Sequence, residues 1–440
     1  SGLTALGYNL LQIWPMVDTM PLPLTTSDRA HLEKMKKVIA IAHELEMTVH
    51  VGASANTIGN AKAGDYDFEN RPYFVAERLL NPADKAEVKE LVEARKVFLE
   101  PLAEADGFWI IDCDPGGYQG STAEEYVHLF DVHRRLLDHL RPGIKLLSWM
   151  WAGWTDNRRG EPQRRAWVDA ARGLAELDPE PWGFLACQKE HFKIIENLGL
   201  LSRAIFFPYG TIEGEPSFPW TNCDPGRIEG AFNYVPSEKY PLGVMGNAQS
   251  HCVQLPGTYM FEHFAHGGTR ETLDLQGFAE DLAPGFGKPL ADGWHAMDGE
   301  DLAALGGAAG ALAEVPAKAQ VPEGRLSGLC FGRPGQLLDD LKVQVALKIA
   351  ILKLREQLAR NHKVEEALGE LVKCLGVWSE RLGFEDRHDG PFKKLLHSVL
   401  KEIATKVAGG ERLADALNAM DSGLIHGAFT RIFEALKSLA

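Results

Sequence analysis

The stretch from Asp28 to Ala53, DRAHLEKMKKVIAIAHELEMTVHVGA, indicates the fold of the chain. Its first part places apolar residues at helical spacing on one face, namely Leu32, Met35, Ile39, Ala42 and Leu45. Its last part, TVHVGA, is a short apolar run of the kind that forms a buried strand. Alternation of helices and strands predicts a parallel sheet, because parallel strands need a long crossover connection between them.

The same alternation continues to about residue 285. The predicted strands are Leu10–Trp14, Thr48–Ala53, Phe108–Cys113, Ile144–Met150, Trp182–Cys187, Arg203–Pro208 and Leu242–Asn247. The predicted helices are 28–46, 84–104, 122–140, 161–176, 188–198 and 256–265. Seven strands are one short of a closed (β/α)8 barrel, so we expect an α/β barrel of the TIM type whose first strand is lacking from this chain. A doubly wound sheet is the alternative, although the GxGxxG fingerprint follows none of the strands.

The composition changes after residue 300, which predicts a division into domains. We expect a catalytic (β/α) barrel over residues 1–300, a linker-like segment rich in Ala, Gly and Pro over 301–333, and an α-helical domain over 334–440. The helical part has the pattern of a small bundle. It shows no catalytic constellation, so packing or self-association through these helices is the expected role.

Charge and cysteine usage limit the partners. The 440 residues carry a net charge of −15, which argues against nucleic acid or an anionic membrane as the main partner. No uncharged apolar run is long enough to span a bilayer. The six cysteines are scattered singly, which slightly favours a reducing, cytoplasmic environment, while a signal peptide ahead of residue 1 stays open.

The stretch FWIIDCDPGGYQGS, residues 108–121, brings two carboxylates to the end of a predicted strand. In a barrel, the chemistry takes place at the C-terminal ends of the strands. Asp112 and Asp114 share a face with Ile110, because residues two apart on a strand point the same way. If Ile110 looks inward, both carboxylates line the inner rim, and one of them has a raised pKa and acts as an acid. The alternative is that one of them caps the following loop.

A hydrophobic fourth strand that ends in closely spaced acids resembles the chitinase and β-N-acetylhexosaminidase group of barrel glycoside hydrolases. The resemblance implies that one of Asp112 and Asp114 protonates the glycosidic oxygen while the other orients a substrate acetamide. The chitinase string DxxDxDxE and the Asp-Glu pair of the hexosaminidases are both absent. The resemblance therefore implies a class of reaction and does not select a family.

A second acidic pair keeps the mechanism open. Glu213 and Glu215 lie in the segment 209–240, a long predicted loop without helical periodicity. With Asp114 as acid and Glu215 as nucleophile, the site would follow a retaining scheme. The alternative for both glutamates is that they are solvated loop charges.

Aromatic and amide side chains gather at the same predicted rim and suit a sugar, whose C–H face stacks on a ring while its hydroxyl groups need polar partners. The candidate substrate-binding residues are Trp14, Asn56, Trp149, Trp151, Trp154, Asp156, Tyr209, Trp220, Asn247, Gln249 and His251. Any single tryptophan among them has the alternative of an ordinary core residue.

The sequence thus predicts a glycoside hydrolase that uses carboxylate acid–base catalysis on glycans that, by the resemblance, contain N-acetylhexosamine. We expect no metal and no cofactor, since His263 and His266 are spaced on a helix without a third ligand and no HExxH string is present. Two alternatives remain. One is a barrel lyase or isomerase acting on a free sugar, which needs a lysine or a metal inside the barrel, and neither Lys145 nor Lys189 is well placed for this. The other is a non-catalytic carbohydrate-binding barrel.

Overall fold

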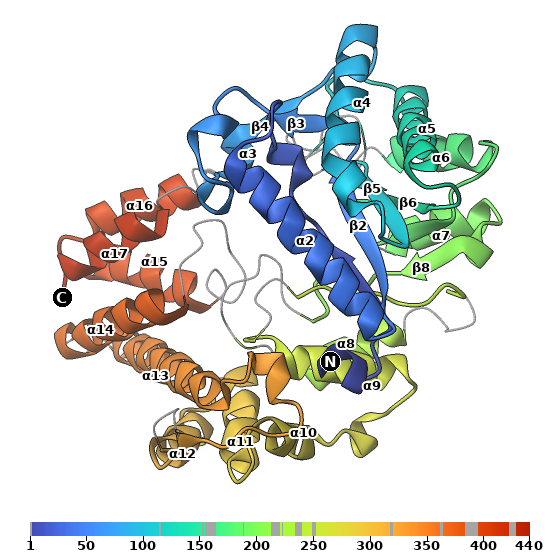
Figure 1. The fold of residues 1–440 in the computed structure, drawn as a ribbon. Coiled ribbons are helices and arrows are strands. Elements are labelled where there is room, and N and C mark those ends of the chain that lie inside the picture. Colours follow the sequence, from blue (N-terminus) through green and yellow to red (C-terminus); the bar gives the residue numbers. More distant parts are fainter. Residues whose placement is uncertain are drawn as a thin grey trace. The chain divides into compact units, whose positions relative to one another are not determined.

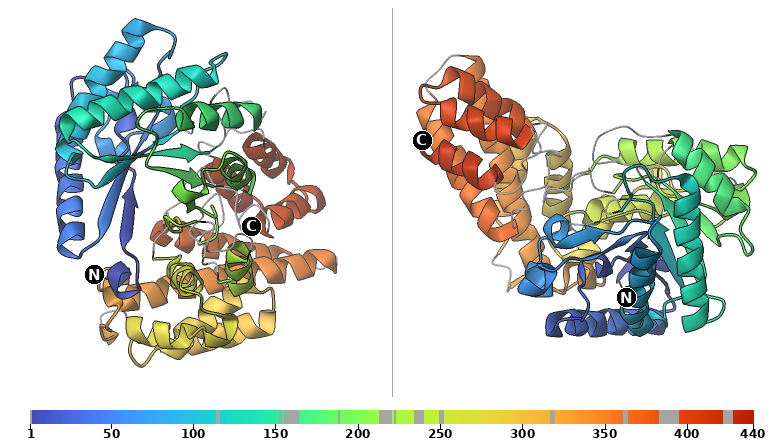
Figure 2. Two further views of the ribbon diagram at one scale, coloured as in Figure 1. Left: turned by 90° about the vertical axis from the view of Figure 1, so that its right-hand side faces the viewer. Right: turned by 90° about the horizontal axis from the view of Figure 1, so that it is seen from above.

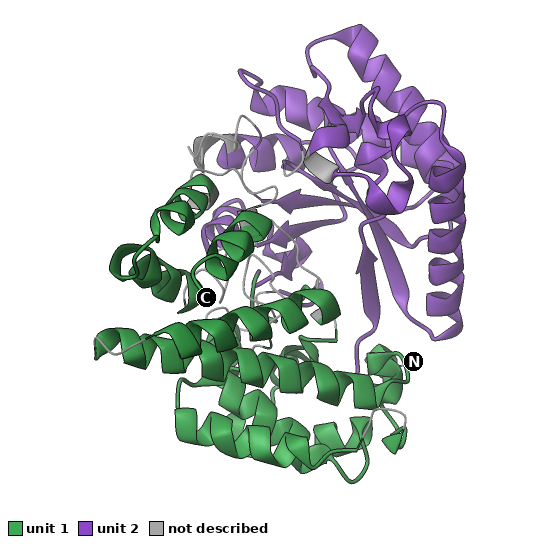
Figure 3. Cartoon of the chain, turned by 90° about the vertical axis from the view of Figure 1, so that its left-hand side faces the viewer, with its two compact units in different colours: residues 1–6, 210–234, 246–440 green, residues 7–209, 235–245 purple. Residues whose placement is uncertain are grey.

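The computed structural model describes residues 2–440 except 114–115, 152–153, 155–163, 188, 213–220, 222, 234–239, 249–251, 317–319, 361–363, 383–394 and 422–427. Figure 1 shows the course of the chain. The chain forms two compact units (Figure 3). The sheet unit contains residues 7–209 and 235–245, and the helical unit contains residues 1–6, 210–234 and 246–440.

The sheet unit is built on a curled, six-stranded parallel sheet, an incomplete TIM-like barrel. Its strands, in spatial order, are β1 (Leu10–Ile13), β2 (Thr48–Ser54), β5 (Gly107–Ile111), β6 (Lys145–Met150), β7 (Gly183–Ala186) and β8 (Ala204–Phe206). Six of the predicted strands are confirmed. The seventh, Leu242–Asn247, forms a single parallel bridge in which Val244 pairs with Phe206.

Helices cover one face of this sheet (Figure 2). They are α2 (Thr26–Glu44), α4 (Lys85–Leu99), α5 (Ala123–Leu140), α6 (Arg164–Ala175) and α7 (Lys189–Asn197). Capping boxes at Thr25 and Thr122 set where α2 and α5 begin. The ring of Phe192 on α7 lies 6.0 Å from the ring of Phe206 on β8. Phe206, and the residues that pair with it across the sheet, therefore lie on the face that the helices cover.

The opposite, inner face is lined by a core cluster, which consists of Trp109, Ile111, Leu147, Trp149, Leu185, Cys187, Ile205 and Phe207. The expectation that the side chain of Ile110 points inward is therefore wrong, because the side chains of its neighbours Trp109 and Ile111 point inward. Gly52 explains this arrangement: it pairs with Trp109 across β2 and β5, and a Cβ at Gly52 would lie 1.8 Å from Cζ2 of the indole. Only a glycine leaves room for this ring.

Three elements differ from the sequence-based expectations or were absent from them. The antiparallel pair β3 (Thr57–Gly59) and β4 (Glu77–Leu79) was not expected, because three-residue strands are too short to show an alternation. The segment 209–240 is not a continuous loop, since α8 (Pro225–Phe232) lies within it. Asp224 caps this helix by accepting a hydrogen bond of 3.0 Å from the amide of Arg227. The sequence does contain a start signal for this helix, because Pro225 occupies its first position.

The helical unit contains the remaining helices. They are α1 (Gly2–Ala5), α8, α9 (Leu255–Ala265), α10 (Leu275–Leu282), α11 (Gly287–Asp298), α12 (Leu302–Ala313), α13 (Pro334–Ala359), α14 (Glu365–Leu382), α15 (His397–Lys406), α16 (Glu411–Asp421) and α17 (Ala428–Lys437), and the sheet unit adds the short α3 (Tyr73–Ala76). None of the described helices is long and apolar enough to span a membrane.

Residues 302–313 are helical, although composition predicted a linker-like segment over 301–333. Helix α13 packs directly on α11: a Cβ at Gly293 would lie 2.5 Å from Cδ2 of Leu341, and Lys348 Nζ donates a hydrogen bond of 2.5 Å to the carbonyl of Met297. The domain boundaries near residues 300 and 333 stay predictions.

Three histidines of the sheet unit are fully buried, at 0–1% exposure: His50, His133 and His191. Burial lowers the pKa of His50 and His133 to about 4 and that of His191 to about 3. In the unfolded chain these histidines bind protons near pH 6.5. Between about pH 6.5 and pH 4 the unfolded state therefore holds more protons than the folded state, and stability falls as the pH is lowered.

The variant His191→Leu tests this origin of acid sensitivity. We expect the free energy of unfolding of the wild type to fall across this window by up to about 1.4 kcal/mol per pH unit for each buried histidine. Removal of one such group should reduce the slope by about that amount. Urea unfolding at several pH values between 7.5 and 4.5 measures it, and an unchanged slope in the variant would contradict the assignment.

Candidate functional site

The candidate site begins where β5 ends. Asp112 follows Ile111 and is only 4% exposed. Its amide donates to the carbonyl of Trp149 over 3.2 Å, and its carboxylate Oδ1 accepts a hydrogen bond of 3.2 Å from the amide of Trp151. Asp112 therefore joins the exits of the neighbouring strands β5 and β6 and fixes the backbone from which Trp151 projects.

Gly116 and Gly117 then turn the chain with φ values of 130° and 78°, which favour glycine. A Cβ at Gly117 would lie 2.6 Å from the carbonyl oxygen of Trp154. The chain therefore turns sharply after β5, and its close approach to the backbone of Trp154 requires the absence of a side chain at Gly117.

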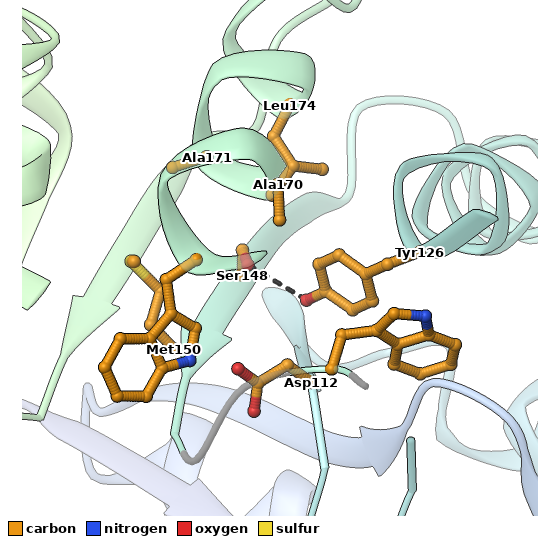
Figure 4. A pocket seen from close by; sticks show the side chains of 9 residues that line it. Asp112, Tyr126, Ser148, Met150, Ala170, Ala171 and Leu174 are labelled. Atoms are coloured by element: carbon orange, nitrogen blue, oxygen red, sulfur yellow. Dashed lines mark hydrogen bonds between the residues drawn. The ribbon is translucent and has the colours of Figure 1, made fainter. Parts of the chain in front are cut away.

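The carboxylate of Asp112 lines a small cavity between the sheet and the helices α5 and α6 (Figure 4). The other lining residues are Tyr126, Ser148, Met150, Trp154, Trp167, Ala170, Ala171 and Leu174. Tyr126 Oη and Ser148 Oγ share a hydrogen bond of 3.0 Å. Burial, with the negative charge of Asp112 nearby, raises the pKa of Tyr126, so that it stays a neutral phenol.

Asp112 therefore faces the helix-covered side of the sheet and not the inner rim, which corrects the orientation inferred from Ile110. Since Trp109 and Ile111 occupy the inner face, alternation directs the next even-numbered residue toward α5 and α6. Several other predicted site residues lie outside the described residues: Asp114, Asp156, Glu213, Glu215, Trp220, Gln249 and His251. The pairing of Asp112 with Asp114 stays a prediction.

Five rings form a continuous group on the inner face of the sheet unit, here called the aromatic arc: Trp14, Trp109, Trp149, Trp151 and Tyr209. Centroid distances are 5.1 Å from Trp14 to Trp109, 4.6 Å from Trp109 to Trp149, 6.1 Å from Trp149 to Trp151 and 4.4 Å from Trp151 to Tyr209. Trp14, Trp151 and Tyr209 are half-buried and follow the ends of β1, β6 and β8. The structure thus unites four predicted residues.

Trp109 was not singled out from the sequence. It shares a strand face with Ile111, whose Cα partner across the ladder is Trp149. That register follows only from the paired sheet, and it brings the two indoles together.

A buried network holds Trp14 in place. The indole Nε1 of Trp14 donates a hydrogen bond of 2.8 Å to Asp18 Oδ2, and Asp18 Oδ1 accepts 2.7 Å from Arg95 Nη2 and 2.8 Å from Ser54 Oγ. The side chains of Asp18 and Arg95 are both fully buried. Arg95 also donates to the carbonyl of Thr57 over 2.8 Å. Sequence reasoning missed this pair, because an arginine within a helix has the pattern of a solvated charge.

Two other predicted binding residues are enclosed by the protein. Asn56 is fully buried, and its amide nitrogen donates to the carbonyls of Leu80 and Gly117 over 2.8 and 3.1 Å. Trp154 is 1% exposed and donates to Ser121 Oγ over 2.6 Å. Both side chains stabilise the turn around Gly117. Asn247 is half-buried, and its Oδ1 accepts a hydrogen bond of 3.4 Å from the amide of Gly210.

Within the described part of the chain no group of three or more His, Cys, Asp or Glu side chains has the arrangement of a metal site.

No protein-family model matches the sequence, and no curated protein matches it. Among solved structures, the chain is similar to that of CpGH84B, with 10% identity, a TM-score of 0.46, and coverage of 91% of this chain and 74% of that one. It is also similar to a mutant of the Thermobaculum terrenum O-GlcNAc hydrolase, with 10% identity, a TM-score of 0.46, and coverage of 92% and 90%. CpGH84D follows with 11% identity, a TM-score of 0.39, and coverage of 96% and 61%. At these values the similarities concern the course of the backbone and give no residue a role.

Proposed function

We propose that this protein binds a glycan on the aromatic arc and hydrolyses a glycosidic bond by carboxylate acid–base catalysis. The observation that carries the proposal is the position of the arc: its half-buried members Trp14, Trp151 and Tyr209 follow the C-terminal ends of three strands. That end is where barrel enzymes hold their substrates. Flat rings beside polar groups suit the C–H face of a sugar.

Trp151 and Tyr209 form the part of the arc best suited to stack a ring. Their ring centroids lie 4.4 Å apart with an interplanar angle of 67°, so the two rings form a corner. The amide of Trp151 is fixed by Asp112, and Trp149 supports its ring at 6.1 Å. A sugar ring that enters this corner meets a surface whose shape is set before binding.

The acid is proposed to come from the segment that follows β5. Asp114 would give its proton to the glycosidic oxygen as the C–O bond breaks, and water would supply the hydroxyl of the new reducing end. Asp112 would position this segment through its contact with Trp151. Glu215, two residues after Glu213, would supply the nucleophile in the retaining variant of the scheme. By the resemblance of the segment, the substrate contains N-acetylhexosamine.

One observation favours a second candidate function, non-catalytic carbohydrate binding. The carboxylate of Asp112 lines a cavity beside α5 and α6 and accepts the amide hydrogen of Trp151, so it serves the protein backbone. A sugar lyase or isomerase has less support. Lys145 begins β6, at the strand end opposite the arc, and its Nζ lies over the Trp182 ring at 4.5 Å.

A direct assay separates these functions. The full chain is incubated with aryl β-N-acetylglucosaminides, aryl β-N-acetylgalactosaminides and aryl β-glucosides, and binding of the corresponding glycans is measured in parallel. Hydrolysis of the N-acetylhexosaminides supports the first candidate, and the anomer formed first, seen by NMR, distinguishes retention from inversion. Binding without turnover supports the second candidate, and neither binding nor turnover contradicts both.

Trp151→Ala tests the binding surface. We expect glycan affinity to fall roughly 10-fold, about 1.4 kcal/mol, while the melting temperature stays close to that of the wild type, because the ring is half-buried. Trp154→Ala is the matched control from the same segment. Its ring is 1% exposed, so it should cost about 3–5 kcal/mol of stability. If Trp151→Ala loses as much stability as Trp154→Ala, then Trp151 is a core residue and not part of a binding surface.

A further inference from the structure

The cavity between the sheet and helices α5 and α6 has the size of one very small molecule. Its volume is about 10 Å³. A single water molecule needs roughly 10–15 Å³ of such space. The side chains that line the cavity are all buried, with exposed fractions of at most 7%. The cavity therefore lies within the sheet unit, and it has no room for a sugar ring.

Three polar groups from three different elements reach this cavity. The carboxylate of Asp112 comes from the end of β5, the hydroxyl of Ser148 from β6 and the hydroxyl of Tyr126 from α5. Figure 4 shows that all three point toward the same space, which α6 closes from the other side. The interior of the cavity is therefore polar, and a polar cavity of this size is suited to water.

The two hydroxyl groups leave one hydrogen to donate. Tyr126 Oη and Ser148 Oγ lie 3.0 Å apart, and only one of their two hydrogens can lie between the oxygens. The second hydrogen can donate to another acceptor. The carboxylate of Asp112, by contrast, can only accept hydrogen bonds while it is ionised.

Trp167 of α6 contributes a second donor. Its indole Nε1 is buried and has no hydrogen-bond partner among the described residues. A buried donor without a partner is costly, and nearly all such groups in native proteins are paired. Trp154, the other indole of the cavity, differs in this respect, because its Nε1 donates to Ser121 Oγ over 2.6 Å.

We infer that the cavity binds one water molecule, which donates to the carboxylate of Asp112 and accepts from Trp167 and from the pair of Tyr126 and Ser148. Water both donates and accepts, so it matches a cavity that offers one acceptor group and two donors. An anion would be repelled by the carboxylate, and a cation would be repelled by the donor hydrogens. The water joins the exit of β5 to the helices α5 and α6.

This water gives Tyr126 and Trp167 a positioning role for the rim. Asp112 Oδ1 accepts the amide hydrogen of Trp151 over 3.2 Å, so a carboxylate held by the water fixes the backbone from which Trp151 projects. The water site does not depend on the proposed function, whereas its effect on glycan binding rests on that function.

The first test needs no variant. In the full chain labelled with 15N-tryptophan, the Nε1 hydrogen of Trp167 should show a nuclear Overhauser effect to water. The Nε1 hydrogen of Trp149 should show none, because it donates to the sulfur of Cys187 within the protein.

The variant Ala170→Val identifies the source of this signal. Ala170 lines the cavity, so two added methyl groups leave no room for the water while both hydroxyl groups remain. The Overhauser effect at Trp167 should therefore be lost. It should persist in the matched control Ala94→Val, since Ala94 is also a buried helical alanine but lies on α4, outside the cavity lining.

The amide signal of Trp151 reports the positioning role. It should shift in Ala170→Val and in Tyr126→Phe and stay in place in Ala94→Val. Glycan affinity should fall about 3–10-fold in the first two variants, as expected for one lost hydrogen bond.

Three results would overturn the inference. Trp167 shows no Overhauser effect to water in the wild type, or the effect persists in Ala170→Val, or Tyr126→Phe leaves the Trp151 amide signal unchanged. If Ala170→Val does not fold, the wild type and Tyr126→Phe still decide. A chain that binds no glycan contradicts the proposed function, and the Overhauser effect and the amide signal then test the water site alone.

Discussion

Asp18→Ala is expected to lower the free energy of unfolding by about 3–5 kcal/mol, because it leaves a fully buried arginine without its counter-ion. Asp18 also accepts hydrogen bonds from the indole of Trp14 and from the hydroxyl and amide of Ser54. Loss of the carboxylate therefore frees the end of β2 together with the first ring of the aromatic arc. Urea unfolding at pH 7 measures the change.

Two further variants show whether the unpaired charge is the cause. The double variant Asp18→Ala with Arg95→Met should be more stable than Asp18→Ala alone, since it removes the charge as well as its partner. Glu93→Ala is the control on α4, the helix that carries Arg95. It breaks an exposed ion pair with Lys89 and should change stability by no more than roughly 0.5 kcal/mol. A cost below about 1 kcal/mol for Asp18→Ala would show that Arg95 finds other partners.

Asp114→Asn is expected to reduce turnover of a glycoside with a poor leaving group by roughly 100-fold or more. The expectation rests on the proposed function, in which Asp114 donates the proton to the glycosidic oxygen. Aryl glycosides with activated leaving groups need little protonation, so their turnover should fall far less. The basic limb of the pH–rate profile should flatten as well, because the titrating acid is gone.

Asp112→Asn is the control for Asp114→Asn, because it removes the other carboxylate of the same segment, two residues earlier. Its side chain accepts the amide hydrogen of Trp151, and an asparagine oxygen can still accept it. We expect a smaller loss that affects good and poor leaving groups alike, as for a residue that positions Trp151. If Asp114→Asn shows that same uniform loss with an unchanged pH profile, Asp114 is not the acid, and Glu215 becomes the residue to test.

The strands of the sheet were predictable because a buried parallel strand is a continuous apolar run between helices. Thr48–Ala53 and Phe108–Cys113 both have this form, and β2 and β5 lie there. The short elements were not predictable in the same way. Helix α8 has eight residues, and strands β3 and β4 have three each, so each is shorter than the window over which its periodicity can be read.

The candidate site was predictable in its location and only partly in its composition. Placement at the C-terminal ends of the strands follows from the barrel alone, and it grouped Trp14, Trp149, Trp151 and Tyr209, whose rings lie together in the structure. The direction of Asp112 did not follow. Alternation states which residues share a face, but it does not state which face is the inner one.

The sequence by itself determined the order of the parallel strands and of the helices between them, and the end of the sheet at which the aromatic residues gather, because these features depend on local periodicity along the chain. Only the tertiary structure decided that Trp109 lies inward, since this depends on the empty space over Gly52 on a neighbouring strand. It alone brought Asp18 to Arg95 and placed Gln12 beside His50. These contacts join residues far apart in the chain, and their energies depend on burial, which no local pattern contains.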